Sequence, residues 1–197
     1  MNWFQRTKHW WIELDEIAGV ATIARRYFVM SGFDGILTMV GLTVGSFLAR
    51  IDSPRLIIAT GLSTAIAMGV SGLWGAFISE RSERKHDLLE MESAMLVSLN
   101  KTRINQIRRQ AIIVLSLVNG LAPFVSALIC LTPFMFAGWL GGIKTAYYLS
   151  FALITLVIFC FGIFLGKISD EHLVFSGLKM LMAGVACVAI LWMVEIV

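Results

Sequence analysis

The stretch 30-MSGFDGILTMVGLTVG-45 lies inside a run of apolar and small residues long enough to cross a membrane, and it carries one carboxylate, Asp34. A bilayer-spanning helix needs roughly 20 mostly apolar residues. A segment in lipid must satisfy its own backbone hydrogen bonds, so such runs predict helices. Five runs qualify, at about 27–49, 56–79, 111–136, 146–166 and 174–196.

The composition supports a membrane protein. Hydrophobic residues make up 58% of the 197 residues and charged residues only 15%, whereas soluble domains carry roughly 25% charged residues. The alternating segments of about ten residues that are typical of membrane β-barrels do not occur. We therefore expect an all-α polytopic membrane protein, with an amphipathic segment at 1–26 and a five-helix transmembrane domain at 27–197.

The distribution of basic residues predicts the orientation. Thirteen of the 16 Lys and Arg residues fall in the N-terminal segment and in the second and fourth connections. Because basic residues near span ends mark the cytoplasmic side, the N-terminus is expected in the cytoplasm. The net charge of +3 then reflects topology and gives no reason to invoke a nucleic-acid partner. The sequence fits either a cell membrane or a vacuole-like membrane.

Two polar segments are expected to be helical outside the bilayer. The N-terminal segment places Trp and aliphatic residues on one face, which predicts a helix lying on the membrane surface. Beyond Ser79 no Gly or Pro occurs until Gly120, which predicts a cytoplasmic helical hairpin over about 80–110 that turns near Ser98–Thr102. Pro54 suits the first turn of the second span, and Pro123 is expected to kink or break the third.

Asp34 is the unusual acid of this chain, because the other twelve of the 13 Asp and Glu residues lie in connections or at span ends. It lies about 10 Å into the bilayer at roughly 1.5 Å per helical residue, where an Asp costs on the order of 2.5–3.5 kcal/mol. One interpretation is structural, as a protonated acid bonded to a neighbouring helix or as a group near the lipid headgroups. The other is a pathway for a cation or proton. Thr38, Gly41 and Gly45 continue its helix face, and Met30 lies one turn before it.

A second candidate site is an acidic strip on the expected hairpin. Four acids share an arc of about 80° on the helix, and a histidine follows the second of them at i+3, the spacing that di-iron helices use. The strip could collect divalent cations, or it could be a solvated face with charge pairs such as Glu80–Arg84. Its residues are Glu80, Glu83, His86, Asp87 and Glu90.

The order of Arg26, Gly32 and the run 34-DGILT-38 resembles the first span of the vacuolar iron transporter family. The stretches 60-TGLSTAIAMGVSGLWGAFIS-79 and 119-NGLAPFVSALICLTPF-134 resemble its second and third spans. The resemblance covers about residue 25 to the C-terminus. It implies a five-span homodimer with a pathway between protomers and proton-coupled export of Fe²⁺ or Mn²⁺ from the cytosol. It also implies that Asp34 binds metal and exchanges protons.

The chain departs from that family in its second span. The family commonly reads S-M-x-x-G-E-[YF] there, whereas this chain has Gly72 in place of the Met and Ala76 in place of the Glu. Met68, one turn before Gly72, is a candidate replacement for the missing thioether. Family members often carry a longer, Glu-rich cytoplasmic domain than the segment of about thirty residues expected here.

The leading hypothesis is a divalent transition-metal transporter, for iron or manganese, that works within the lipid bilayer as a homodimer. Asp34 would be the cation and proton site, with Met30 and Met68 as soft ligands and the acidic strip as a capture site. The metal would be cargo, and no cofactor is expected. Two alternatives stay open: a non-transporting dimeric scaffold or sensor, and a proton or monovalent-cation pathway. No triad, Cys-His pair or nucleotide loop points to an enzyme.

Overall fold

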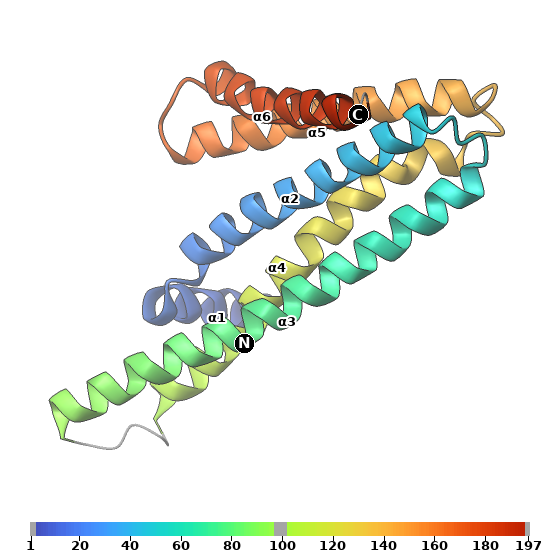
Figure 1. Ribbon diagram of the computed structural model, residues 1–197. Coiled ribbons are helices and arrows are strands. Elements are labelled where there is room, and N and C mark those ends of the chain that lie inside the picture. The colour runs from blue at the N-terminus through green and yellow to red at the C-terminus, as the bar shows by residue number, and fades with distance from the viewer. Residues whose placement is uncertain (1–2, 97–101, 196–197) are drawn as a thin grey trace. The chain divides into compact units, whose positions relative to one another are not determined.

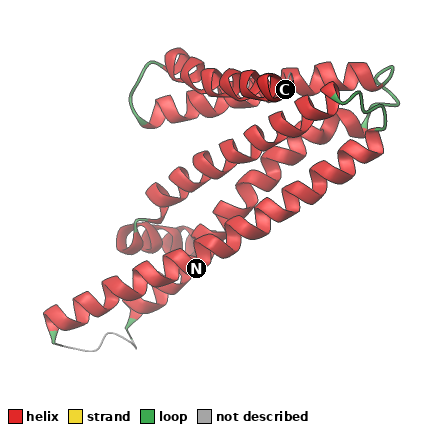
Figure 2. Ribbon diagram, in the orientation of Figure 1, coloured by secondary structure: helices red, strands yellow, loops and turns green. Residues whose placement is uncertain are grey.

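The protein is built from α-helices. A computed structural model describes residues 3–96 and 102–195, with side chains for all of these except 3–9, 11, 194 and 195. Figure 1 labels the helices, which are α1 (Trp3–Ala18), α2 (Val20–Leu48), α3 (Pro54–Met95), α4 (Arg103–Met135), α5 (Ile143–Ile168) and α6 (Leu173–Glu195). Over the described ranges there is no strand (Figure 2), which confirms the all-α prediction.

Five of the helices, α2 to α6, are long and apolar enough to cross a membrane, as the sequence predicts. The α3 helix begins at Pro54 and continues without a break past Ser79 to Met95, so the expected extension of the second span is confirmed. Of the turn expected near Ser98–Thr102, residues 98–101 lie outside the described part of the chain. The α4 helix passes through Pro123 and Pro133, so Pro123 does not break the third span, and a kink there stays a prediction.

A glycine separates the N-terminal helix from the first span. Gly19 has φ +59°, a left-handed conformation that ends α1 and that Gly adopts without the steric cost of a Cβ. The N–H of Ala21 donates to Asp15 Oδ1 at 2.9 Å. A carboxylate at a helix start satisfies a free N–H and complements the helix dipole, so Asp15 stabilises the point where α2 begins.

The chain divides into two compact units, Met1–Phe28 with Val70–Leu121 and Val29–Gly69 with Ala122–Val197. In the first unit, Leu14 and Val20 are buried in a cluster with Ile107, Ala111 and Leu115 of α4. The α1 helix therefore packs against α4 through part of its apolar face. Ile12 and Ile17 remain exposed on α1, and its location at a membrane surface stays a prediction.

The second unit holds the larger hydrophobic cluster, in which Ile36, Met39, Ile57 and Phe134 are essentially inaccessible. Within it α5 and α6 lie side by side (Figure 1). A Cβ added at Gly162 would lie 2.5 Å from the Cα of Gly177. Because the two backbones meet at these glycines, larger residues cannot be accommodated there, as is typical of helix packing in membranes.

We expect Gly162→Ala to destabilise the α5–α6 pair by about 1–3 kcal/mol, the usual cost of an overpacked contact. Thermal unfolding of the full-length protein in detergent should show a lower midpoint. Gly75→Ala is the matched control, because a Cβ on Gly75 meets nothing within 4 Å and Ala is the better helix former. Equal midpoints for the two variants would contradict the close α5–α6 contact.

Candidate functional site

Two glycines on either side of Asp34 set the rotation of α2 in the second unit. A Cβ at Gly32 would lie 2.6 Å from the Phe161 ring of α5, and a Cβ at Gly35 would lie 2.7 Å from the backbone of Pro123 in α4. A side chain at Gly35 would meet backbone, and one at Gly32 would require the Phe161 ring to shift. At about 100° per residue, Asp34 lies on the opposite side of the helix from these two contacts. The G-x-D-G order therefore turns the carboxylate away from the unit's own core.

Asp34 is accordingly exposed in the single chain, and so are Met30 and Thr38 on the same face. The Thr38 hydroxyl donates to the Asp34 carbonyl oxygen at 2.8 Å, which is a bond within the helix. Among the described residues the Asp34 carboxylate has no hydrogen-bond or ion-pair partner. The face continues to Gly41 and Gly45, where an added Cβ would meet nothing within 4 Å. We call Met30, Asp34, Thr38, Gly41 and Gly45 the α2 stripe.

Three further positions from the sequence analysis are not part of the α2 stripe. They are Met68, the other predicted intramembrane ligand, and Gly72 and Ala76, the two positions that differ from the family pattern. Met68 is half-buried against the hydrophobic cluster of the second unit. In the first unit, Gly72 has no side chain that could bind a metal. It packs closely on α4, since an added Cβ would lie 2.8 Å from the Asn119 carbonyl oxygen. The Asn119 amide in turn donates to the Gly72 carbonyl at 2.8 Å. Ala76 is buried, at 6% exposure.

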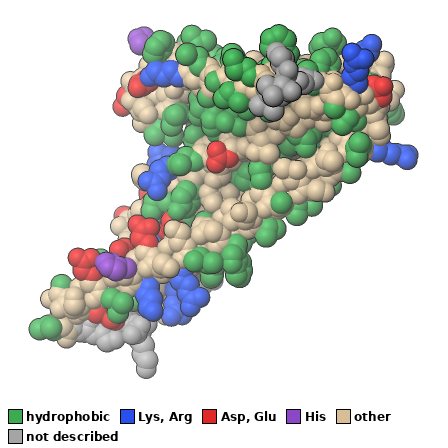
Figure 3. All heavy atoms as spheres, in the orientation of Figure 1, with side chains coloured by type: hydrophobic (Ala, Val, Ile, Leu, Met, Phe, Trp, Pro, Cys, Tyr) green, Lys and Arg blue, Asp and Glu red, His purple; other side chains and the backbone are tan. Residues whose placement is uncertain are grey.

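The acidic strip divides between the interior and the surface of a hairpin formed by residues 80–95 of α3 and 103–115 of α4, which we call the α3–α4 hairpin. Figure 3 shows acidic, basic and histidine side chains gathered along it. Glu80 is only 4% exposed. It accepts the Tyr27 hydroxyl at 2.8 Å and the Arg84 Nε at 3.1 Å, so its carboxylate is already bonded. Arg84 also donates to the Ala18 carbonyl at 3.3 Å.

The contacts of Glu80 give it a structural role that its position in the sequence did not suggest. It joins the start of α2, the C-terminal end of α1 and α3 within the first unit. The expected Glu80–Arg84 pair is confirmed. Tyr27 was missed by the sequence analysis, because a tyrosine at a span end is usually explained by the headgroup region alone.

The remaining strip residues have different surroundings. Glu83, His86 and Glu90 are exposed. Asp87 is half-exposed, and its Oδ2 lies 3.6 Å from Nη1 of Arg108, a buried residue of α4. Among the described residues no group of three or more His, Cys, Asp or Glu side chains is placed to hold a metal ion. The single chain thus brings Met30 and Asp34 onto one face, and the strip onto one hairpin, without assembling a closed ligand set.

Arg108 is a second residue that the sequence analysis missed. It lies on the α4 face that also buries Ile107, Ala111 and Leu115. A charged residue within an apolar helical stripe is the pattern that would have identified it.

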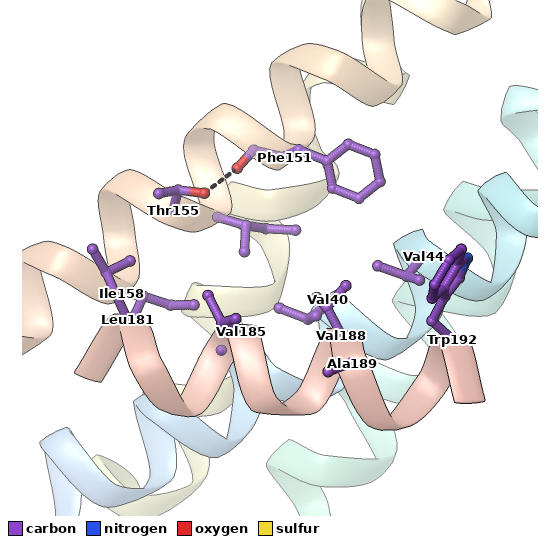
Figure 4. Close-up of a pocket in the computed structure, with 12 residues that line it drawn as sticks. Val40, Val44, Phe151, Thr155, Ile158, Leu181, Val185, Val188, Ala189 and Trp192 are labelled. Atoms are coloured by element: carbon purple, nitrogen blue, oxygen red, sulfur yellow. Dashed lines mark hydrogen bonds between the residues drawn. The ribbon is translucent and has the colours of Figure 1, made fainter. Parts of the chain in front are cut away.

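An apolar pocket of about 370 Å³ lies between α2, α5 and α6 of the second unit. Figure 4 shows Val40, Val44, Val185 and Trp192 lining it. The hydroxyl of Thr155 in its wall donates to the carbonyl of its own helix at 2.8 Å. The lining residues include no carboxylate and no thioether, and the Trp192 indole N–H is a donor that cannot bind a cation, so the α2 stripe is the better candidate in this unit.

We expect Glu80→Ala to lower the stability of the protein by about 3–5 kcal/mol, because it leaves the Arg84 guanidinium buried without its carboxylate. Glu83→Ala removes an exposed acid one turn away and should change stability by no more than about 0.5 kcal/mol. Thermal unfolding of both variants in detergent measures the difference. If both variants unfold at the wild-type midpoint, the Tyr27–Glu80–Arg84 contacts do not stabilise the fold.

Comparisons with known proteins find one family and one similar protein. Residues 25–108 match the model of the VIT family, a range that includes the α2 stripe, Met68 and the whole acidic strip. An uncharacterized protein of Methanocaldococcus jannaschii is 30% identical over 173 residues, which cover 86% of this chain and 87% of that protein.

Proposed function

Since the chain belongs to the VIT family of metal-ion transporters and is an integral membrane protein, we propose that it carries Fe²⁺ or Mn²⁺ out of the cytosol in exchange for protons. Asp34 is the site at which metal and proton compete. The observation that carries this proposal is the exposure of an unpartnered carboxylate on a membrane-spanning helix. A buried acid with hydrogen-bond partners would have a structural explanation, and Asp34 has none among the described residues.

The exchange follows from the chemistry of a carboxylate in a medium of low polarity. An ionised carboxylate away from water is stabilised by a nearby cation, and without one it takes up a proton. A metal ion and a proton therefore bind the same oxygen atoms in turn. Met30, one helical turn from Asp34, would add a thioether that favours transition metals over Ca²⁺ or Mg²⁺. Met68 is the more remote candidate, because it packs against the hydrophobic cluster.

A second copy of the chain is the natural cover for the α2 stripe. Gly41 and Gly45 leave open space on that face, and small residues let two membrane helices approach closely. Two facing stripes would bring two Asp34 carboxylates together, whose combined charge of −2 matches a divalent ion. The resulting homodimer would remove the cost of presenting an acid to lipid.

The exposed acids of the α3–α4 hairpin would act before the membrane step. With the N-terminus inside, this hairpin lies in the cytoplasm, where Glu83, His86 and Glu90 are free to collect ions from solution. Glu80 is excluded from this role, because its carboxylate is bonded to Tyr27 and Arg84. Capture by exposed side chains raises the local concentration of cations and is expected to be weak and sensitive to salt.

Asp34→Asn should reduce metal flux to the level of empty vesicles, because an amide cannot exchange a proton or balance a divalent charge. The assay is Fe²⁺ or Mn²⁺ transport by proteoliposomes under a pH gradient. Asp52→Asn is the matched control, since Asp52 is an exposed acid in the connection between α2 and α3. Flux that survives Asp34→Asn unchanged would rule out the assignment.

The homodimer is tested by Gly41→Leu combined with Gly45→Leu, which fills the open face of α2. We expect the variant to shift to a monomer in light-scattering measurements in detergent and to lose metal flux. Ala152→Leu places a leucine at an exposed position on α5 and should leave the dimer intact. A dimer that persists in the double variant would mean that another face forms the interface.

One observation favours a second candidate, a non-transporting dimeric scaffold or sensor. The positions of the family's second-span Met and Glu are occupied by Gly72, which packs on backbone, and by buried Ala76. Neither supplies a ligand. A dimer that binds no metal and carries no metal flux would support this candidate, and dissipation of the pH gradient without metal would instead support a proton pathway.

A further inference from the structure

The α3–α4 hairpin buries a cationic side chain, Arg108, that has no role in the proposed transport function. Arg108 is 9% exposed and lies against two residues of α3. Its Nη1 is 3.6 Å from Asp87 Oδ2, and its Nη2 is 3.6 Å from Met91 Sδ. Within the described residues, Nε and Nη1 of this guanidinium have no hydrogen-bond partner.

Ordinary hydrogen bonding does not account for this position. A distance of 3.6 Å is beyond the range of an N–H···O bond, and leaving buried N–H groups unpaired is unfavourable. The guanidinium is instead held by the negative charge of Asp87 and by the polarisable sulfur of Met91. A carboxylate oxygen together with a thioether sulfur suits a transition-metal ion.

The two α3 side chains are also accessible from solvent, whereas Arg108 approaches them from inside the hairpin. The Asp87 side chain is 48% exposed and Met91 is 40% exposed. An ion can therefore approach Asp87 from solvent, whereas Arg108 lies on the inner side of the same carboxylate. Glu83 and Glu90 are exposed on the same strip and add negative charge along it.

We propose that Arg108 is an internal competitor for divalent metal at Asp87, so that the hairpin binds Mn²⁺ or Fe²⁺ only when the guanidinium withdraws. This inference rests on the proposed function for the identity of the ion. A monovalent ion brings no more charge than the guanidinium it would replace, whereas a divalent ion brings twice as much. Arg108 thus makes the hairpin selective for divalent over monovalent cations.

The neighbouring charges offer a matched control. Arg84, the nearest buried cation on α3, is held by Glu80 and the Ala18 carbonyl. Arg109 follows Arg108 directly in the chain and is exposed. Arg108→Gln and Arg109→Gln remove the same charge from the same helical turn, and only the first removes the contact with Asp87.

The test is Mn²⁺ binding to the full-length protein in detergent, measured by titration calorimetry. Arg108→Gln should tighten binding by about fivefold or more, a coupling of ordinary size, and Arg109→Gln should change it less than twofold. Adding Asp87→Asn to Arg108→Gln should cancel the gain. Equal effects of the two Arg variants, or no Mn²⁺ binding in Arg108→Gln, would overturn the proposal.

A second measurement uses the unsubstituted chain and so does not depend on how the variants fold. Phenylglyoxal modifies accessible arginines, and mass spectrometry reports each site. Saturating Mn²⁺ should increase modification of Arg108, because the metal displaces it, and should leave Arg109 unchanged. Arg108 reactivity that stays the same or falls with Mn²⁺ would contradict the proposal.

The two proposals fail in different ways. Metal flux that depends on Asp34, without a gain in Mn²⁺ affinity for Arg108→Gln, would overturn only the role of Arg108. Tighter Mn²⁺ binding by Arg108→Gln in a chain that carries no flux would overturn transport and keep the competition at Asp87.

Discussion

The close approach of α2 to α4 and α5 at two glycines is the contact on which the candidate ion site depends. A Cβ at Gly35 would come within 2.7 Å of the Pro123 backbone, and one at Gly32 within 2.6 Å of the Phe161 ring. These contacts favour one rotation of α2 about its axis, since a side chain at Gly35 would meet the α4 backbone and one at Gly32 would displace the Phe161 ring. In that rotation Ile36 and Met39 are buried, and Asp34 with Thr38 points the other way. The acid is therefore exposed because its neighbours are small.

Asp34 and Glu80 show how differently two acids of one chain can be used. Asp34 lies among apolar residues, where a carboxylate is costly, and has no partner within the described chain. Glu80 lies in a charged segment, where an acid is unremarkable in sequence, and is buried with two donors. A carboxylate with bonded oxygens holds helices together, as Glu80 does for α1, α2 and α3. A carboxylate with free oxygens can exchange one cation for another, which is what a transport site requires.

Arg108 and Asp87 are an intermediate case. The acid is half-exposed and has a cation beside it, yet the 3.6 Å separation is too long for the hydrogen-bonded geometry of a strong ion pair. Such a pair neutralises charge without consuming the ligand atoms. The hairpin therefore combines a bonded acid at Glu80, a charge-compensated acid at Asp87 and free acids at Glu83 and Glu90. The capacity of the strip for metal depends on which of these states each acid has, and the spacing of the acids alone does not reveal it.

Much of the architecture could be predicted from the amino-acid sequence, because the constraints behind it are local. Runs of about twenty apolar residues must be helices in lipid, and a segment free of Gly and Pro from Ser79 to Met95 continues the α3 helix. Pro54 begins that helix because the fixed φ of proline suits the first helical position, which is again a local constraint. The third span is not broken at Pro123, because the penalty of a proline in a helix is local, whereas α4 is held by packing along its whole length. The Asn119 carbonyl lies against Gly72, which has no side chain to obstruct it.

The candidate site itself was only half predictable. Asp34 could be identified from composition, since a charge in an apolar run is conspicuous. The division of the acidic strip could not, because one face of a helix looks uniform until the helices packed against it are known. Tyr27 and Arg108 come from segments 53 residues before Glu80 and 21 residues after Asp87, and their contacts arise only on folding. Periodicity along one helix says which residues share a face, and contacts between helices say which of those residues still have free atoms.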